Sequence, residues 1–123
     1  MRRAINAAVI NDKKILLVNK KEVWILPGGK PEENESDLDC LSREVKEELG
    51  AGLDSIKYYG EFEGITPHKK DTLGAIVYFA DIIGKPKASA EINSCEWAKD
   101  ASRYKLSDIT SKIINSLRKD NYL

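Results

Sequence analysis

The sequence predicts an α/β protein in which helices pack on a mixed β-sheet. Segments rich in Val, Ile, Tyr and Phe predict strands before and after an amphipathic helix, and a second such helix follows near the end. This order of strands, helix, strands and helix is typical of a mixed sheet covered by helices. The chain has 123 residues, 41% of them hydrophobic, which is enough for one core and too few for two ordinary domains. We therefore expect one domain over residues 1–123.

The first strands are separated by short polar segments. Alternating apolar residues predict a strand over residues 3–10, and an uninterrupted apolar run predicts a buried strand over residues 15–18. The Asn-Asp-Lys sequence between them has turn chemistry, so these two strands are expected to form a hairpin. Residues 24–26 form a short apolar run that Pro27 ends, and residues 28–31 are predicted to be a loop.

Serine caps mark the start of both predicted helices. Ser36 precedes a helix over residues 37–49, which Gly50 is expected to end. One side of this helix carries an apolar stripe that comprises Leu38, Leu41, Val45 and Leu49. Ser107 precedes the second helix, which is predicted to run to about residue 118. The intervening strands are predicted over residues 55–62, 73–82 and 92–98.

Charge and cysteine content exclude several classes of function. The formal net charge is zero, with 20 basic and 20 acidic residues, so there is no overall basic field to hold long nucleic acid. The two cysteines, Cys40 and Cys95, lack the CxxC spacing of zinc sites, and a disulfide framework is not expected. No apolar run has the length of a signal peptide core or a membrane span. We expect a cytoplasmic protein with no membrane or long nucleic-acid partner.

Three carboxylates of the first helix are predicted to lie together. Glu44, Glu47 and Glu48 are spaced i, i+3 and i+4, which places them on one side of a helix beside the apolar stripe. A lone acid-rich helix is usually a solvated face, but this spacing costs stability unless a cation relieves the repulsion. Mg²⁺ prefers oxygen ligands and is commonly shared between carboxylates and substrate phosphates. Arg43 is placed to pair with Glu47 or with Glu35.

These acidic residues belong to a longer pattern that resembles a known motif. Gly29 is followed by five residues and Glu35, then by seven residues and the segment REVKEELGA at positions 43–51. The pattern is similar to the Nudix box, G-x5-E-x7-R-E-U-x-E-E-x-G-U, in which U is a bulky aliphatic residue. Every fixed identity is present, and the one departure is Ala51, which is smaller than the usual residue and concerns packing rather than chemistry. The preceding Leu-Pro-Gly-Gly-Lys segment is similar to that of MutT-like members.

The resemblance implies both a fold and a reaction. The fold it implies is an α/β/α sandwich with a mixed central sheet, over essentially the whole chain. The implied reaction is hydrolysis of the phosphoanhydride bond of a nucleoside diphosphate-linked substrate with Mg²⁺, or with Mn²⁺ as an alternative. The first hypothesis is a MutT-like nucleoside triphosphate pyrophosphohydrolase. One alternative is a hydrolase of ADP-ribose or dinucleotide polyphosphates, and another is a non-catalytic nucleotide-binding module. The implied partner is a small nucleotide, and the protein is expected to be a monomer or homodimer.

The resemblance also implies roles for the box residues. Glu47 and Glu48 correspond to metal ligands, Glu44 to a ligand or general base, and the carbonyl of Gly28 to a further ligand. Catalysis in the family also depends on a supporting pair that positions these carboxylates, here Glu35 and Arg43.

A further acidic residue and several cations complete the candidate set. MutT-like enzymes use a carboxylate from a loop before a Glu-Trp strand, and Glu91 lies six residues before Trp97 here, so it is either an extra ligand or base, or a solvated loop acid. Glu96 is expected to face solvent and Trp97 to pack in the core. Candidate substrate-binding residues are Gly29, Lys30 and His68. The loop lysines and the strand aromatics have either a substrate-binding or a structural role, and the sequence does not distinguish between the two.

Overall fold

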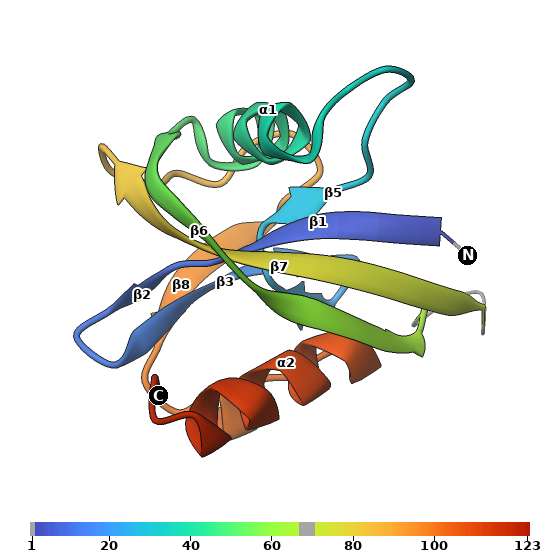
Figure 1. The fold of residues 1–123 in the computed structure, drawn as a ribbon. Coiled ribbons are helices and arrows are strands. Elements are labelled where there is room, and N and C mark those ends of the chain that lie inside the picture. The colour runs from blue at the N-terminus through green and yellow to red at the C-terminus, as the bar shows by residue number, and fades with distance from the viewer. Residues whose placement is uncertain (1, 67–70) are drawn as a thin grey trace.

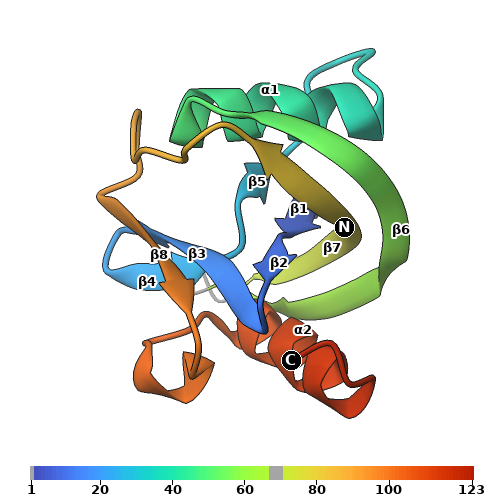
Figure 2. The ribbon, with the colours of Figure 1, turned by 90° about the vertical axis from the view of Figure 1, so that its left-hand side faces the viewer.

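The computed structural model describes residues 2–66 and 71–123, which form two four-stranded sheets between two helices (Figures 1 and 2). The elements of the first sheet are β1 (Arg2–Ala8), β5 (Gly28–Gly29), β6 (Gly52–Ile65) and β7 (Thr72–Ile83). The elements of the second sheet are β2 (Ile10–Asn11), β3 (Lys14–Lys20), β4 (Val23–Ile25) and β8 (Ser94–Ala98). The remaining elements are α1 (Asp37–Leu49), a short 3₁₀ turn η1 (Ala101–Arg103) and α2 (Asp108–Lys119).

The first sheet is mixed and has the strand order β5-β1-β7-β6. β1 runs parallel to β7, with Ile5 opposite Ile76, while β5 and β6 pair antiparallel to their neighbours. The long strand β6 curves around the sheet, and its register with β7 shifts between residues 54 and 60 (Figure 2). This sheet therefore brings the start of the chain against the Gly28–Gly29 segment.

The second sheet is antiparallel and is built around β3. β2 and β4 pair with its two halves, and β8 pairs along it, with Leu16 opposite Trp97. Residue Trp24 also exchanges backbone hydrogen bonds with the segment before α2, from Trp24 N to the Lys105 carbonyl and from Ser107 N to the Trp24 carbonyl. These bonds place the start of α2 beside β4.

Helix α1 covers one side of the sheets and is capped as predicted. The Ser36 hydroxyl accepts a hydrogen bond from Asp39 N at 3.1 Å, and Gly50 ends the helix in the left-handed conformation with φ 63°. The helix buries Leu41, Val45 and Leu49 against side chains from both sheets. Other members of this core are Ile5, Ala7, Val9, Leu16, Val18, Cys40 and Ile92.

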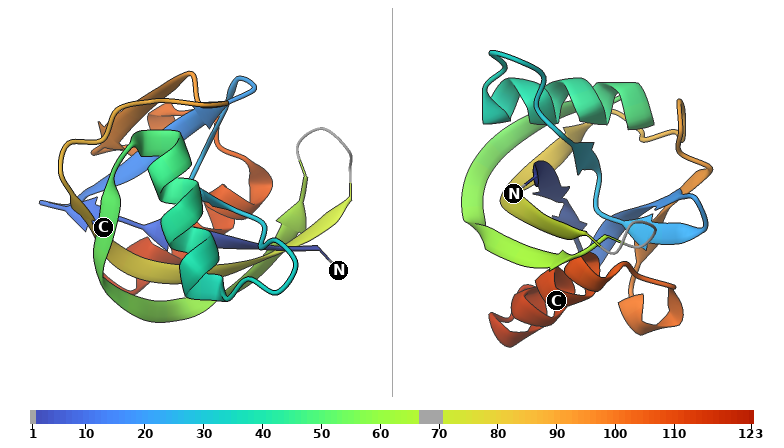
Figure 3. Two further views of the ribbon diagram at one scale, coloured as in Figure 1. Left: turned by 90° about the horizontal axis from the view of Figure 1, so that it is seen from above. Right: turned by 90° about the vertical axis from the view of Figure 1, so that its right-hand side faces the viewer.

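Helix α2 covers the opposite side and forms a second core (Figures 1 and 3). The Ser107 hydroxyl accepts a hydrogen bond from Thr110 N at 3.2 Å, which confirms the predicted cap. The helix buries Ile109, Ile113, Ile114 and Leu117. The α/β/α arrangement that the sequence implied is thereby confirmed.

Two local predictions were wrong. Residues 28 and 29 are not a loop but strand β5, in which Gly28 pairs with Asn6 and Gly29 with Ile5. Gly28 has φ 143°, and a Cβ there would lie 2.0 Å from the Ile5 carbonyl oxygen, so only glycine permits this pairing. Leu38 does not belong to the buried stripe, because 46% of it is exposed at the first turn of α1.

Strand boundaries also differ from the prediction. β6 and β7 extend beyond the predicted strands at both ends, while β8 begins at Ser94 instead of residue 92. Ile92 is nevertheless buried, as part of the segment that leads into β8. Within the described residues, neither helix has the length and apolar character needed to cross a membrane.

Candidate functional site

Arg43 organises the acidic side of α1. Its guanidinium donates two hydrogen bonds to Glu35, with Nε 2.8 Å from Oε2 and Nη2 2.9 Å from Oε1. This bidentate contact holds the pKa of Glu35 at about 2 and raises that of Arg43 above its usual range. Nη1 lies 2.5 Å from Glu44 Oε1 and 3.5 Å from Glu47. Arg43 was predicted to pair with Glu47 or with Glu35; it contacts both, and the contact with Glu35 is the shorter of the two.

The carboxyl group of Glu44 lies directly against the backbone of Gly29. A Cβ added to Gly29 would fall 1.9 Å from Glu44 Oε2, so the absence of a side chain at Gly29 makes room for this carboxylate. Burial raises the pKa of Glu44 above its ordinary value, although the nearby Arg43 opposes that shift. The group that approaches Gly29 is thus a carboxylate of α1.

Glu48 lies deeper than the sequence suggested. Only 5% of the residue is exposed, whereas the helical spacing had placed the carboxylates at the edge of the core. Its Oε1 accepts a hydrogen bond from Gly28 N at 3.0 Å. The pKa of Glu48 is raised to about 7, chiefly by burial. The hydrogen bond from Gly28 N opposes this increase, and the negative charges of Glu44 and Glu47 contribute to it. A buried carboxylate beside like charges is the environment that a bound cation stabilises.

The donor chemistry of this cluster fits a hard divalent cation. Glu44, Glu47 and Glu48 supply only oxygen atoms, and each raises the cost of ionising a neighbour. In the present side-chain positions, no three acidic, histidine or cysteine side chains within residues 2–66 and 71–123 are arranged to hold a metal ion. The guanidinium of Arg43 contacts both Glu44 and Glu47 in this arrangement.

A cleft of about 390 Å³ opens beside the acidic cluster. The charged and polar lining includes Lys20, Lys21, Gly29, Lys30 and Glu44. Much of the remaining lining is apolar and comes from β4, from the β6–β7 hairpin and from α2, with Val23, Ile25, Ile65, Leu73, Ile109 and Ile113. The cleft therefore combines cations and a carboxylate with apolar surface, which suits a ligand that has both phosphates and a base.

Asn6 also lines the cleft, although it was not among the residues predicted for the site. Its side-chain amide donates to the Leu26 carbonyl at 3.1 Å, and the residue lines the cleft from the middle of β1. The signal in the sequence was a lone amide within the otherwise apolar run of residues 4–10.

The strand aromatics that were open to a role in base stacking pack elsewhere. Trp24 contacts Tyr104 edge-to-face at 5.1 Å, and Tyr78 contacts Tyr58 at 5.8 Å. Phe62 and Phe79 both stack around Tyr59. None of the aromatic residues that the structure describes lines the cleft.

The remaining predicted residues divide among three locations. Glu91 is exposed, and its Oε2 forms an ion pair with Lys20 Nζ at 3.0 Å. Glu96 is exposed and accepts a hydrogen bond from Tyr104, and Trp97 packs against the core under α1, both as expected. His68, together with the two lysines that follow it, lies outside the described residues.

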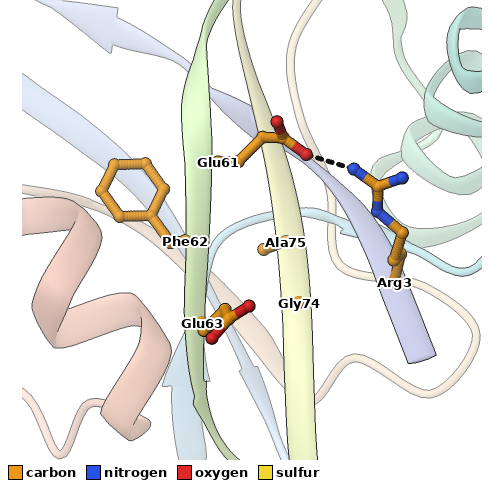
Figure 4. Close-up of a pocket in the computed structure, with 6 residues that line it drawn as sticks. All are labelled: Arg3, Glu61, Phe62, Glu63, Gly74 and Ala75. Carbon is orange, nitrogen blue, oxygen red and sulfur yellow. Dashed lines mark hydrogen bonds and ion pairs between the residues drawn. The ribbon is translucent and has the colours of Figure 1, made fainter. Parts of the chain in front are cut away.

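A second hollow lies between β1, β6 and β7 and is separate from the carboxylate cluster (Figure 4). It is lined by Arg3, Glu61, Phe62, Glu63, Gly74 and Ala75. Arg3 and Glu61 form an ion pair there, and Glu63 adds a second carboxylate. Among the described residues, the one cation in its lining, Arg3, is paired with Glu61, whereas three lysines line the cleft beside α1, so that cleft is the better candidate site for a polyanionic ligand.

Comparisons with known proteins agree with this fold. The NUDIX domain profile matches residues 1–109. The chain is 33% identical over 120 residues to an m7GpppN-mRNA hydrolase of Saccharomyces cerevisiae. This match covers 90% of the chain but only 12% of the yeast protein. It is 37% identical over 70 residues to a putative 8-oxo-dGTP diphosphatase of Bacillus subtilis, covering 57% of the chain and 43% of the relative.

Solved structures give the same result. A MutT NUDIX hydrolase from Burkholderia pseudomallei superposes with a TM-score of 0.77 at 26% identity, and the match covers 95% of both chains. A putative Nudix hydrolase family member from Chromobacterium violaceum has a TM-score of 0.78 at 25% identity, and the match covers 97% of this chain and 77% of the other. The profile match over most of its length, together with the fold, shows that this chain belongs to the NUDIX domain family.

Proposed function

We propose that the protein is a Mg²⁺-dependent hydrolase that cleaves the diphosphate linkage of a small nucleotide, with a nucleoside triphosphate as the first candidate substrate. One observation carries the proposal: the carboxylates of Glu44 and Glu48 lie against Gly29 and Gly28, beside a cleft that lysines line. Two solved relatives with this fold are described as Nudix or MutT hydrolases, and one curated relative as a putative 8-oxo-dGTP diphosphatase.

Each side chain near the cleft has a defined task in this proposal. Glu47, Glu48 and the Gly28 carbonyl would hold the cation, with Glu44 as a further ligand or as the base. The bound cation would neutralise the diphosphate and lower the pKa of the attacking water. Arg43, fixed by its two bonds to Glu35, limits the positions that Glu44 and Glu47 can adopt.

Residues beside the cleft would accept the proton of the attacking water and bind the phosphates. The attacking water forms a bond to phosphorus, the P–O bond to the leaving phosphate breaks, and a carboxylate accepts the proton of the water. Glu44 suits this task because burial raises its pKa, and a base is most effective when its pKa is close to the working pH. Lys20, Lys21 and Lys30 would bind the phosphates, and the apolar side chains that line the cleft would contact the nucleoside. The products are a phosphate monoester and the remaining phosphate-containing half.

A second candidate substrate is a capped RNA end. The similarity to the yeast m7GpppN-mRNA hydrolase extends over 90% of this chain, which is more than the 57% covered by the diphosphatase relative. Since the chain spans 12% of that yeast protein's length, the match concerns the shared domain alone. The neutral net charge favours the small nucleotide, because long RNA is usually held by basic surface.

A substrate panel tests the proposal. Purified protein is incubated with nucleoside triphosphates, 8-oxo-dGTP, ADP-ribose, dinucleotide polyphosphates and a capped RNA oligonucleotide, with Mg²⁺ or with EDTA. Glu48→Gln serves as the inactive variant, and Glu96→Gln, which removes an exposed carboxylate of β8, as the matched control. We expect Mg²⁺-dependent turnover that Glu48→Gln abolishes and Glu96→Gln keeps. Nucleotides that raise the melting temperature without being hydrolysed would instead indicate a non-catalytic binding module.

A further inference from the structure

A tight hairpin places two lysines in the lining of the cleft. Lys20 ends β3 and pairs with Val23 across the turn, and both Lys20 and Lys21 line the cleft. The two turn residues, Lys21 and Glu22, have positive φ of 50° and 66°, which only a few per cent of non-glycine residues adopt. The turn is short and conformationally restricted, so the backbone position of Lys20 is well defined.

Glu91 is carried by a segment that is fastened on both sides. Ser89 N donates to the carbonyl of Glu48 at 2.8 Å, and Asn93 N donates to the carbonyl of Asn19 at 2.8 Å. Between them, Ile92 is buried in the core under α1. The segment connects the end of β7 to β8 and passes beside α1 (Figure 2). It therefore joins the last turn of α1 to the end of β3.

The turn that presents Glu91 is itself constrained. Ile92 N donates to the Ser89 carbonyl at 3.1 Å, and Ala90 adopts a left-handed φ of 57°. Alanine rarely adopts this conformation, and such exceptions often mark functional positions. The Glu91 backbone is thus fixed relative to both α1 and β3.

The two constrained turns meet in one ion pair, between Glu91 Oε2 and Lys20 Nζ at 3.0 Å. The Lys20 side chain is 34% exposed and that of Glu91 is 76% exposed. Such exposed pairs contribute little to folding. The pair does orient a flexible lysine that would otherwise sample many rotamers, and loss of that freedom before binding favours affinity.

We infer that Glu91 is a positioning residue that holds the Lys20 ammonium beside the cleft, where Lys20 binds the phosphates of the substrate. The inference rests on the proposed function and assigns Glu91 a role other than metal ligand or general base. When a diphosphate enters, Lys20 donates to phosphate oxygens while Glu91 keeps its ammonium directed toward them. No covalent step involves either residue.

Binding of inorganic pyrophosphate tests the inference directly. Calorimetry compares the wild type with Lys20→Met, Glu91→Gln and the double variant, with Mg²⁺ and again with EDTA. Asp12→Asn is the matched control, because Asp12 is an exposed turn acid and asparagine tolerates its positive φ. We expect about tenfold weaker binding for Lys20→Met and about threefold weaker for Glu91→Gln. The double variant should match Lys20→Met alone, because Glu91 acts through Lys20.

Kinetics with the best nucleotide of the substrate panel supply a second measurement. Lys20→Met and Glu91→Gln should raise KM by the same factors, with kcat and the Mg²⁺ concentration for half-maximal activity unchanged. The melting temperature should also be unchanged in Glu91→Gln. Lys20→Arg should restore binding in part, because it keeps the charge.

Other outcomes overturn the inference and separate it from the proposed function. If Glu91→Gln increases the Mg²⁺ requirement or lowers kcat about 100-fold at constant KM, Glu91 is a ligand or base. If the two substitutions have multiplicative effects on pyrophosphate binding, the residues act independently and the positioning role is wrong. If the expected binding pattern is observed but no nucleotide is hydrolysed, the proposed function fails while the Lys20–Glu91 assignment stands.

Discussion

The two helices begin alike and differ in what they bury. Each is preceded by a serine whose hydroxyl accepts a hydrogen bond from the third residue of the helix. α2 buries aliphatic side chains and one threonine, whose hydroxyl bonds to Ser107 at 2.8 Å. α1 buries a carboxylate, Glu48, among its aliphatic residues.

The difference indicates separate roles for the two sides of the molecule. A buried carboxylate with like charges nearby lowers stability unless it is protonated or bound to a cation. The buried hydroxyls of Ser107 and Thr110 at the start of α2, by contrast, bond to each other. We therefore expect substitution of the α1 carboxylates to change activity at little cost to stability. Substitution of an α2 core residue that does not line the cleft should change stability alone.

The largest effect is expected for Glu48→Gln. The variant should lose about 1000-fold in kcat, since it removes an oxygen ligand or proton acceptor at the reacting group. It should melt at a higher temperature than the wild type in EDTA at pH 8, because glutamine avoids burying a charge. Steady-state kinetics and thermal denaturation measure the two effects. A variant that is both active and less stable would contradict the assigned role of α1.

A core substitution in α2 should have the opposite profile. Leu117 is fully buried, so Leu117→Ala is expected to lower the free energy of unfolding by about 3 kcal/mol. Activity per folded molecule should stay within about twofold of the wild type, because Leu117 does not line the cleft. Urea denaturation and kinetics at low temperature check both values. A loss of kcat without a loss of stability would show that α2 takes part in catalysis.

The pH dependence of stability should isolate Glu48. Its folded-state pKa of about 7 exceeds the ordinary value of 4.5, so the folded protein binds the extra proton between these values. The stabilisation is present in full below pH 4.5 and is lost as the pH rises through about 7. Without metal, the loss is on the order of 3 kcal/mol. Urea denaturation in EDTA from pH 5 to pH 8 should show this decline in the wild type, whereas Glu48→Gln should remove most of it.

The smallest effects concern the two caps. Ser36→Ala and Ser107→Ala should each lower the free energy of unfolding by about 1 kcal/mol. The loss should be greater at Ser107, because that hydroxyl is buried and its removal also deprives the Thr110 hydroxyl of its partner. Equal losses would show that burial of the cap does not matter.

The sequence predicted both helices and most strands because their signals are local. Ser36 and Gly50 bracket α1, and apolar runs mark β3 and β7. The pairing of Gly28 and Gly29 with β1 was missed, since two glycines carry no strand preference and the pairing depends on residues far away in the chain.

The candidate site was predicted in part. The spacing of Glu44, Glu47 and Glu48 identified the acidic side of α1, and the contact of Arg43 with Glu35 was foreseen. Burial of Glu48 depends on how β5 packs against α1, which helical spacing does not reveal. The pairing of Glu91 with Lys20 joins two turns that are distant in the sequence, so no local pattern predicts it. The role of His68 stays a prediction.

Calorimetric titration with Mn²⁺ tests the central claim most directly, because it measures cation binding by the α1 carboxylates without assuming a substrate. Wild-type protein, Glu48→Gln and Glu96→Gln are compared at one pH above 7, where Glu48 is ionised. We predict that the wild type and Glu96→Gln bind Mn²⁺ alike and that Glu48→Gln binds it at least about 100-fold more weakly. Equal binding by all three proteins, or none by the wild type, would contradict a metal-binding role for the acidic side of α1.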